Sequence, residues 1–341
     1  MKILTFVNYY LPGYKAGGPI RTIANMVAQL GDQLDFWILT ADRDAQDSVP
    51  YEDIVVDDWN SVGKAKVYYA SPGAWSLRNI RRLVSEISPG VVYLNSFFST
   101  LTMRYLVLRY LKLVPPIPVV LAPRGEFSSG ALQIHALKKR VYLLLTSFFF
   151  FYKRLLWQAS SSKEKVEIES VMGDDIDVCI APNIPYLGDN NLERIQKITK
   201  SKKPGSVRFI FLSRVSPKKN LDFLLKILPL LSGNIVLDIY GSISDRRYWR
   251  KCNDIIQKLP PHVQVTYCDQ IPHERVFETL KQYHFFVLPT LGENFGHAIL
   301  ESLSVGCPVV ISDQTPWSNV DDSASGWSIS LKALDLWREV L

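Results

Sequence analysis

Short apolar runs alternate with longer segments of helical periodicity along most of the chain. The runs in the first half are apolar on both faces, which is typical of parallel strands covered by helices. The helix expected after the first run has Pro19 near its start. The strands predicted here are 3–8, 36–40, 67–70, 91–95 and 119–122, and the first helix carries Ile20, Ile23, Met26, Val27 and Leu30 at helical spacing. This alternation predicts a Rossmann-like α/β domain.

A polar segment rich in Lys, Asn and Ser interrupts the pattern after Pro182-Asn183, and a second alternating series follows it. That series predicts strands at 209–213, 235–240, 263–268, 285–289 and 309–312, with a helix at 220–231. We therefore expect two Rossmann-like domains, 1–183 and 206–341, joined by a linker at 184–205. Because ligands bind beyond the carboxyl ends of such sheets, we expect the site in a cleft between the domains.

Length and composition agree with two folded domains. A chain of 341 residues exceeds the ~250–300 residues at which one core stops growing. With 47% hydrophobic and 21% charged residues it is neither disordered nor a coiled coil. Four scattered cysteines without a C-x-x-C pair favour a reducing compartment, and the N-terminus lacks the features of a signal peptide. The longest apolar run, 141–152, is shorter than the ~20 residues that span a bilayer, so we expect a cytoplasmic protein.

The charge is concentrated in one segment of the first domain. Between Trp59 and Lys163, fifteen Lys and Arg residues accompany only two acidic residues, a local charge of +13 within a chain of net +6. A basic and aromatic helix is expected here, and its cations are Lys138, Lys139, Arg140, Lys153 and Arg154. Such a segment suits an anionic membrane surface, although a core helix with solvated ends has the same pattern. No nucleic-acid-binding motif accompanies the charge, so we expect no nucleic-acid partner.

Two loops at predicted strand ends have the chemistry to bind an anion. Gly17 and Gly18 lie between the first strand and the first helix, where backbone N–H groups can approach a phosphate, although a simple turn also uses two glycines. Arg214 and Lys219 follow the strand at 209–213 and can offer a fork and a point charge to a diphosphate. Two cations in a surface loop are also commonly just solvated.

The most informative segment places two carboxylates after the strand at 285–289. Glu293 lies in the loop, and Glu301 lies inside a helix expected to begin near Gly296. One carboxylate can reach a sugar while the other accepts hydrogen bonds from the two hydroxyls of a ribose. Backbone N–H groups from Asn294 to His297 can hold a phosphate at the helix start. Two unrelated glutamates on a surface helix would leave Gly292, Gly296 and Gly306 without an explanation.

Together these motifs resemble the family 4 glycosyltransferases, whose fold is GT-B. The resemblance rests on Glu293 and Glu301 with seven residues between them, the stretch 302–310 after them, Arg214 and Lys219, and the Gly17-Gly18 pair. It covers nearly the whole chain. The segments 16–22, 122–126 and 312–317 resemble bacterial enzymes of O-antigen and exopolysaccharide assembly in particular.

The resemblance implies transfer of a sugar from a UDP- or GDP-linked donor to an acceptor with retention of configuration and without a metal or other cofactor. By position, Arg214 and Lys219 neutralise the leaving diphosphate and Glu301 binds the ribose. Glu293 and the backbone at Phe295 and Gly296 hold the transferred sugar, while Gly17 and Gly18 close the phosphate side. The leaving diphosphate can itself take the acceptor's proton, so no protein nucleophile is required.

Two departures from the family pattern stand out. Many relatives have a histidine where this chain has Arg124, and an arginine cannot act as a base. Glu126 and His297 are the substitutes to consider, each with a structural role as the alternative. Relatives also continue into a long helix that crosses back to the first domain, whereas here only the segment 331–341 remains for it.

Three functions remain open on these observations. The first is a glycosyltransferase at the cytoplasmic face of a membrane, acting on a polyprenyl-diphosphate-linked saccharide. The second is a non-catalytic or degenerate GT-B partner subunit, favoured by Arg124 and the short C-terminal segment. The third is a GT-B nucleotide-sugar epimerase. The sequence does not distinguish donor sugars.

Overall fold

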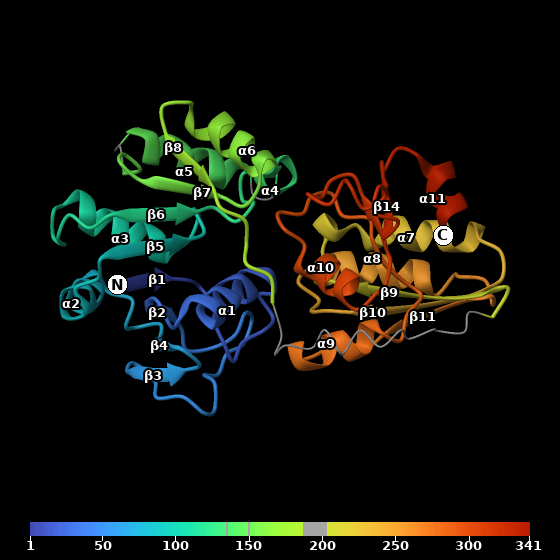
Figure 1. Ribbon diagram of the computed structural model, residues 1–341, viewed down its shortest axis with the longest axis horizontal. Coiled ribbons are helices and arrows are strands. Elements are labelled where there is room, and N and C mark those ends of the chain that lie inside the picture. Colours follow the sequence, from blue (N-terminus) through green and yellow to red (C-terminus); the bar gives the residue numbers. More distant parts are fainter. Residues whose placement is uncertain (134–135, 149–150, 187–202) are drawn as a thin grey trace. The chain divides into compact units, whose positions relative to one another are not determined.

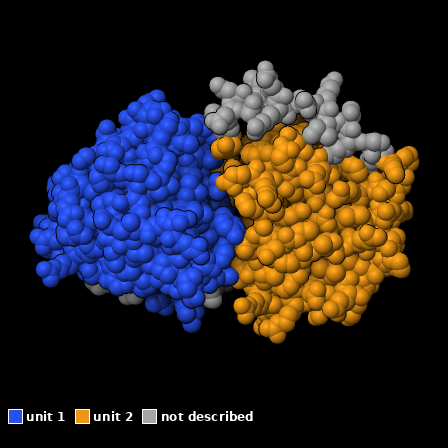
Figure 2. Space-filling view, turned by 90° about the horizontal axis from the view of Figure 1, so that it is seen from below, with its two compact units in different colours: residues 1–185 blue, residues 186–341 orange. Residues whose placement is uncertain are grey.

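The computed structural model describes residues 1–133, 136–148, 151–186 and 203–341. By its contacts the chain divides into unit 1, Met1–Pro185, and unit 2, Tyr186–Leu341, which Figure 2 colours blue and orange. Most of the linker expected at 184–205 lies outside the described residues. Both units contain a largely parallel sheet with helices, which confirms the predicted class of two Rossmann-like α/β domains.

The sheet of unit 1 has eight strands in the order β3-β4-β2-β1-β5-β6-β7-β8, as Figure 1 shows. Every neighbouring pair is parallel except β3 and β4, which run antiparallel. The first strand in the sequence, β1, therefore lies inside the sheet. The strands are β1 Lys2–Phe6, β2 Asp35–Ala41, β3 Trp59–Val62, β4 Ala65–Ala70, β5 Val91–Asn95, β6 Val119–Ala122, β7 Leu156–Ala159 and β8 Asp177–Ile180.

Helices cover both faces of this sheet because its strands are apolar on both sides. On one face, Ile23 and Val27 of the first helix pack with Phe36 and Ile38 of β2. On the other face, residues of the next two helices join Leu4 and Phe6 of β1 in a separate cluster. The helices are α1 Gly18–Leu30, α2 Leu77–Ile87, α3 Thr100–Tyr110, α4 Ser129–Gln133, α5 Ala136–Phe148 and α6 Ser162–Met172.

Unit 2 has a six-stranded sheet, ordered β11-β10-β9-β12-β13-β14, in which all neighbouring strands are parallel. Its strands are β9 Ser206–Leu212, β10 Asn234–Tyr240, β11 Val263–Tyr267, β12 Phe285–Leu288, β13 Val309–Ser312 and β14 Gly326–Ile329. Its helices are the 3-10 helix η2 Pro217–Lys219, α7 Leu221–Ile227, the 3-10 helix η3 Leu228–Leu230, α8 Arg246–Ile256, α9 His273–Leu280, α10 His297–Ser304 and α11 Leu334–Val340.

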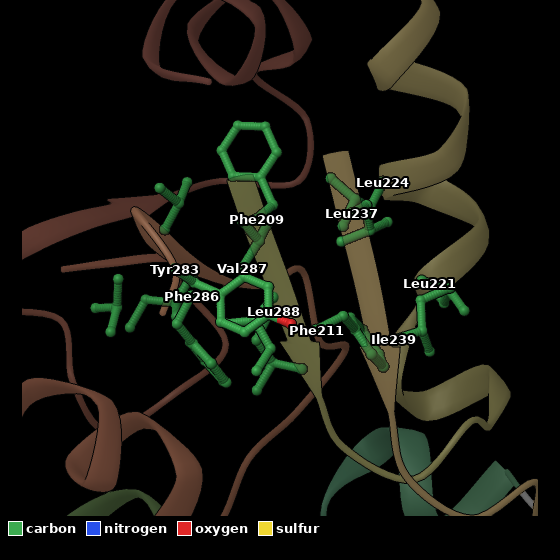
Figure 3. Close-up of a cluster of buried hydrophobic side chains, with 14 of the residues drawn as sticks. Phe209, Phe211, Leu221, Leu224, Leu237, Ile239, Tyr283, Phe286, Val287 and Leu288 are labelled. Atoms are coloured by element: carbon green, nitrogen blue, oxygen red, sulfur yellow. The ribbon is translucent and has the colours of Figure 1, made fainter. Parts of the chain in front are cut away.

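The core of unit 2 lies between the central strands and the helices that cover them. Figure 3 shows Phe209 and Phe211 on β9 beside Leu237 and Ile239 on the neighbouring strand β10. Leu221 of α7 reaches the same cluster. These side chains are completely buried, and each contributes about 1.5–3 kcal/mol when removed from water. Loops follow these strands at their carboxyl ends, outside the core.

The sequence pattern predicts most of the strands but misses four short ones. β3, β7, β8 and β14 have four residues each and were not predicted. β3 and β8 are edge strands, and their partly exposed residues lack the continuous apolar runs of the central strands. The helix predicted at 220–231 is interrupted, because α7 ends at Ile227 and a 3-10 turn containing Pro229 follows.

The basic helix is also shorter than predicted. α5 ends at Phe148, and Lys153 and Arg154 lie in a turn before β7. Arg154 has a φ of 55°, which is incompatible with a helix, and Arg109 donates to the carbonyl oxygens of Lys153 and Arg154 at 3.0 and 3.1 Å. Among the described residues, no helix is both long enough and apolar enough to cross a bilayer.

The C-terminal segment folds into the core of unit 2. Trp337 of α11 is completely buried, its ring lies 5.4 Å from that of Phe223, and its Nε1 donates to the carbonyl of Ser330. The segment 331–341, expected to be the remnant of a crossing helix, thus includes a helix that packs on its own unit.

The carboxylate of Asp222 in α7 accepts hydrogen bonds from Tyr248 and Lys251 in α8, and this contact gives a first testable prediction. Although burial favours the neutral acid, hydrogen bonds from Lys251, Tyr248 and Lys226 lower the pKa of Asp222 from 3.8 to about 2. The ionised form therefore stabilises the fold above pH ~4, and this contribution disappears as the pH falls through about 2. Because both lysines are more than half exposed, we expect Asp222→Asn to lower the unfolding free energy at pH 7 by only about 1 kcal/mol.

Urea unfolding at a series of pH values checks this prediction. The difference between wild type and Asp222→Asn should be constant from pH 7 to pH 5 and should shrink between pH 4 and pH 2. A difference that stays the same down to pH 2 would show that the carboxylate charge contributes nothing.

Candidate functional site

Two neighbouring strands of unit 2 place the predicted donor-binding residues at one edge of the sheet. β9 and β12 are adjacent and parallel, so the loops that follow them begin side by side. The two loops are also hydrogen-bonded to each other, because Leu291 N and Thr290 Oγ1 both donate to the carbonyl of Lys218, at 2.8 and 3.1 Å. The cations of the first loop are therefore held next to the carboxylate of the second.

Lys219 and Glu293 form a close ion pair across these loops. The Lys219 ammonium donates to both oxygens of the Glu293 carboxylate. The Lys219 and Glu293 side chains are only 11% and 13% exposed, so the two charges neutralise each other in a largely desolvated place. An ammonium has three N–H donors, and the two Glu293 oxygens account for two of them. A third can donate to a further anion without breaking the pair.

Arg214 lies close enough to interact with the same carboxylate. Arg214 as a whole residue is exposed, but its guanidinium is surrounded by protein atoms, and this desolvation lowers the pKa of the guanidinium. The negative charge of the Glu293 carboxylate acts in the opposite direction and raises that pKa. A lowered arginine pKa still leaves the group charged at neutral pH. Two cations, Arg214 and Lys219, therefore accompany one carboxylate at the end of β9.

The segment 312–317, part of the bacterial resemblance, holds the Glu293 loop in place. Glu293 N donates to the carbonyl of Gln314 at 2.9 Å, and Trp317 Nε1 donates to the carbonyl of Phe295 at 2.5 Å. Ser312 Oγ donates to the carbonyl of Thr290. The motif thus acts by fixing the backbone that carries Glu293.

Gly296 starts α10 in a conformation that a side chain would oppose. Its φ is 81°, and a Cβ there would lie 2.8 Å from Cδ1 of Ile299. The helix begins with His297, whose ring lies 4.8 Å from that of Phe295. Asn294 and His297 are thus placed around the helix start as predicted, and their binding of a phosphate or of the sugar remains a prediction.

Glu301 has a partner that the sequence did not indicate. On α10, its Oε1 lies 3.1 Å from Nε2 of His273, the first residue of α9. The Glu301 and His273 side chains are 12% and 11% exposed. His273 opens α9 directly after Pro272 and belongs to no recognisable motif, so only the three-dimensional structure brings it to Glu301.

The Gly17-Gly18 loop belongs to unit 1 and is held by an aspartate. Gly17 has a φ of 70° and precedes α1. Asp44, which is almost completely buried, accepts hydrogen bonds from the backbone of Tyr14 and Lys15 at 2.7 and 3.0 Å. Asp44, which follows β2, is therefore a residue that holds this loop and that sequence reasoning missed. The approach of the two glycines to a donor remains a prediction.

Arg124 is engaged by side chains within unit 1. Its guanidinium donates to Asn95 Oδ1 at 3.0 and 2.8 Å, to Asn183 Oδ1 at 2.6 Å and to the Tyr93 hydroxyl. It also has a φ of 59°, a strained backbone conformation for an arginine. These contacts give Arg124 a structural role in joining β5 and β6 to the segment that follows β8.

Glu126 also serves the structure of unit 1. Its carboxylate accepts hydrogen bonds from Ser96 Oγ at 2.6 Å and from the backbone N–H groups of Phe97 and Phe98 at 2.6 and 3.1 Å. Burial raises the pKa of Glu126, and these hydrogen bonds oppose the shift. The carboxylate thus holds the loop before α3, which favours the structural alternative over that of a base.

The predicted site residues are divided between the two units, and the described residues form no metal site. Of the predicted set, Arg214, Lys219, Glu293, Asn294, Phe295, Gly296, His297 and Glu301 lie in unit 2, and Gly17, Gly18, Arg124 and Glu126 lie in unit 1. In the part of the chain that the structure describes, no group of three or more His, Cys, Asp and Glu side chains is arranged as a metal site.

Comparison with solved structures identifies the fold. HepE of Anabaena, in a structure that contains UDP and glucose, superposes with a TM-score of 0.65 at 14% identity, over 92% of this chain and 81% of that one. Sucrose-phosphate synthase of Thermosynechococcus elongatus gives 0.69 at 12% identity, over 99% and 88%. The lipopolysaccharide outer core galactosyltransferase WaaB, in its apo form, gives 0.62 at 16% identity, over 100% and 89%. These similarities confirm the GT-B fold.

Sequence comparison identifies the family of the second unit. No curated protein matches the chain. Residues 193–327 match the family described as glycosyl transferases group 1, and this range contains Arg214, Lys219, Glu293 and Glu301. The resemblance drawn from those motifs is thereby confirmed. Residues 193–327 are thus similar to the glycosyl transferases group 1 family, on a chain with the GT-B fold.

Proposed function

We propose that the chain is a retaining glycosyltransferase that uses a UDP- or GDP-linked sugar and requires no metal or other cofactor. The observation that carries the proposal is the pairing of Lys219 with Glu293 beside Arg214, within the matched family domain. Cations that meet a carboxylate at one sheet edge suit a donor that is anionic at its diphosphate and hydroxylated at its sugar.

In this mechanism the residues act by electrostatics and positioning. The bond between the sugar C1 and the diphosphate oxygen breaks, and its electron pair stays on that oxygen. The acceptor oxygen forms the new bond to C1 on the same face, and its proton passes to the leaving diphosphate. Arg214 and Lys219 stabilise the charge that develops there, while Glu293 accepts hydrogen bonds from the sugar hydroxyls.

We further propose an acceptor linked to a polyprenyl diphosphate, in the assembly of a bacterial surface polysaccharide such as O-antigen, lipopolysaccharide or exopolysaccharide. The resemblance of segments 16–22, 122–126 and 312–317 supports this role. The fold similarity to WaaB is consistent with it. The protein would then work in the cytoplasm, peripherally at the inner face of the cytoplasmic membrane.

A donor screen tests the activity. The purified protein is incubated with UDP- and GDP-sugars and a membrane extract, and both nucleoside diphosphate release and lipid-linked product are followed. We expect one donor to give a product whose anomeric configuration, read by NMR, matches that of the donor, with full activity in EDTA. Isomerised donor would instead identify an epimerase, and no conversion of any donor would favour a non-catalytic subunit.

The surface of α5 supports the membrane part of this proposal. Leu137, Val141 and Leu144, spaced four and three residues apart, are 79%, 48% and 71% exposed, and exposed Lys138 and Arg140 lie on the same helix. An exposed apolar row with neighbouring cations suits the boundary between lipid headgroups and acyl chains.

Lys139 does not share this role. Its ammonium donates to the carbonyl of Ala131 at 2.6 Å and lies 4.9 Å from the centre of the Phe98 ring. Burial lowers the pKa of Lys139. We therefore remove Lys139 from the proposed membrane surface and keep the exposed cations Lys138, Arg140, Lys153 and Arg154.

Vesicle binding separates these residues. Replacing Lys138, Arg140, Lys153 and Arg154 together by Gln should weaken binding to vesicles with anionic lipid by up to about 1000-fold, because each of the four cations near such a surface contributes ~1 kcal/mol. Lys139→Gln serves as the matched control and should leave vesicle binding unchanged. Equal binding by the quadruple variant and the wild type, measured by co-sedimentation, would remove this surface from the proposal.

A further inference from the structure

The contact between His273 and Glu301 joins two helices that are separate in the sequence. His273 Nε2 lies 3.1 Å from Glu301 Oε1, and both side chains are largely buried. A carboxylate can only accept a hydrogen bond, so Nε2 carries the proton and His273 is the donor. The contact restrains one oxygen of the carboxylate that is proposed to bind the ribose.

The imidazole ring is itself held in place by aromatic neighbours. The ring of Tyr186 meets it nearly edge to face, with centroids 5.3 Å apart and planes at 87°. Phe277, one turn further along α9, does the same at 5.8 Å and 85°. With these two contacts on the ring, the Nε2 proton is aimed at Glu301. The histidine can thus transmit the rigidity of its surroundings to the carboxylate.

Restraint of this kind matters for a glutamate more than for a shorter side chain. Ordering a flexible Glu side chain costs roughly 1.5–2 kcal/mol of conformational entropy. If His273 has already imposed part of that order, less of it remains to be lost when a ligand binds. Oε2, and the remaining lone pair of Oε1, stay available to accept from two adjacent hydroxyls.

We infer that His273 is a positioning residue, which aims Glu301 at the ribose hydroxyls of the donor and so sets the preference for a ribonucleotide. This inference rests on the proposed function, because it uses the assignment of Glu301 to the ribose. It adds a residue outside the motif that carries the family resemblance. His273 acts through Glu301 and touches no reacting atom.

Binding of nucleoside diphosphates tests the inference. Calorimetry compares UDP and GDP with their 2′,3′-dideoxy analogues on the wild type, His273→Leu, His273→Gln and Glu301→Gln. Leucine keeps the packing against Tyr186 and Phe277 but has no donor, whereas glutamine keeps an N–H near the position of Nε2. We expect His273→Leu to weaken ribonucleotide binding about 5- to 10-fold and to change dideoxy binding less than about twofold.

Kinetic measurements and control variants show whether weaker binding comes from the loss of the His273 hydrogen bond. His273→Leu should raise KM for the donor while kcat changes less than about threefold, and His273→Gln should restore most of the wild-type affinity. His262, whose Nε2 lies 3.2 Å from the carbonyl of Leu231, provides the matched control, and His262→Leu should bind like the wild type. Thermal unfolding of each variant shows whether a loss reflects misfolding, and His273→Gln keeps the test usable if His273→Leu unfolds.

The possible failures are distinguishable. If Glu301→Gln loses the ribose preference and folded His273→Leu keeps it, the role of His273 is refuted while the proposed function stands. If His273→Leu weakens ribo and dideoxy ligands equally, the histidine acts only structurally and the inference is refuted as well. A wild type that binds neither UDP nor GDP, or binds ribo and dideoxy forms alike, overturns the assignment of Glu301 and this inference with it.

Discussion

Lys219→Met is expected to reduce kcat by about 100- to 1000-fold, which is the usual effect of removing one preorganised donor from a site of developing charge. Methionine retains much of the length and apolar volume of lysine and removes the ammonium. Without it, the leaving diphosphate would lose one of its two proposed cations. Steady-state release of nucleoside diphosphate from the donor identified by the screen measures the loss.

The same substitution affects the fold, and a double variant separates the two effects. In the Lys219→Met variant, the largely buried carboxylate of Glu293 loses the lysine ammonium that pairs with it. Breaking such a buried ion pair costs about 3–5 kcal/mol of stability. Adding Glu293→Gln removes that unpaired charge. We therefore expect the double variant to regain much of the unfolding free energy while its kcat stays at least as low as that of Lys219→Met.

Control variants show whether a loss of turnover is specific to the proposed donor site. Lys281→Met removes a similarly buried lysine of the same unit, which pairs with the exposed Glu278 outside the proposed site, and it should retain wild-type turnover. Glu293→Ala and Arg214→Ala should each abolish turnover in a folded protein. If Lys219→Met, Glu293→Ala and Arg214→Ala were all folded and all fully active, the proposed donor site would be wrong.

The central fold was predictable because buried parallel strands leave an unmistakable pattern. β9 and β12 consist almost entirely of apolar residues, and their neighbours in the sheet cover their edges. The loops that follow them are richer in polar residues. Arg214, Lys219 and Glu293 could therefore be assigned to one sheet edge from sequence alone, since parallel strands end on the same side.

The orientation of individual side chains was not predictable in the same way. Lys139 and Lys138 are adjacent and chemically identical, yet Lys139 bonds to the carbonyl of Ala131 while Lys138 is exposed. The difference arises from the rotation of α5 about its axis, which depends on packing. Charge counting treats both residues alike, and so it overestimates the cations available to a membrane.

Contacts between distant segments were also not predictable from the sequence. Arg124 was compared with a family histidine because of its position after a strand. The structure surrounds its guanidinium with Asn95, Asn183 and Tyr93, residues separated from it by 29 to 59 positions. His273 and Glu301 are 28 positions apart. No local pattern encodes such pairs, because neither partner requires the other for its own helix or strand.

Gly241→Ala is expected to lower the unfolding free energy by at least about 3 kcal/mol and to reduce kcat/KM by about 100-fold. Gly241 follows β10 with a φ of 140°, and a Cβ there would lie 2.1 Å from the carbonyl oxygen of Ser213 and 3.2 Å from the backbone nitrogen of Arg214. Since both contacts are to backbone, the segment that carries Arg214 must move. Urea unfolding and donor turnover measure the two effects.

A second glycine separates this clash from the general strain of a positive φ. Gly205 has a φ of 76°, and a Cβ added there would meet no atom within 4 Å, so Gly205→Ala should cost only about 1–2 kcal/mol and leave kcat/KM unchanged. Equal losses of stability in the two variants would mean that the backbone around Ser213 adapts without cost. Wild-type turnover in Gly241→Ala would show that the position of Arg214 does not depend on the close approach of the segments that follow β9 and β10.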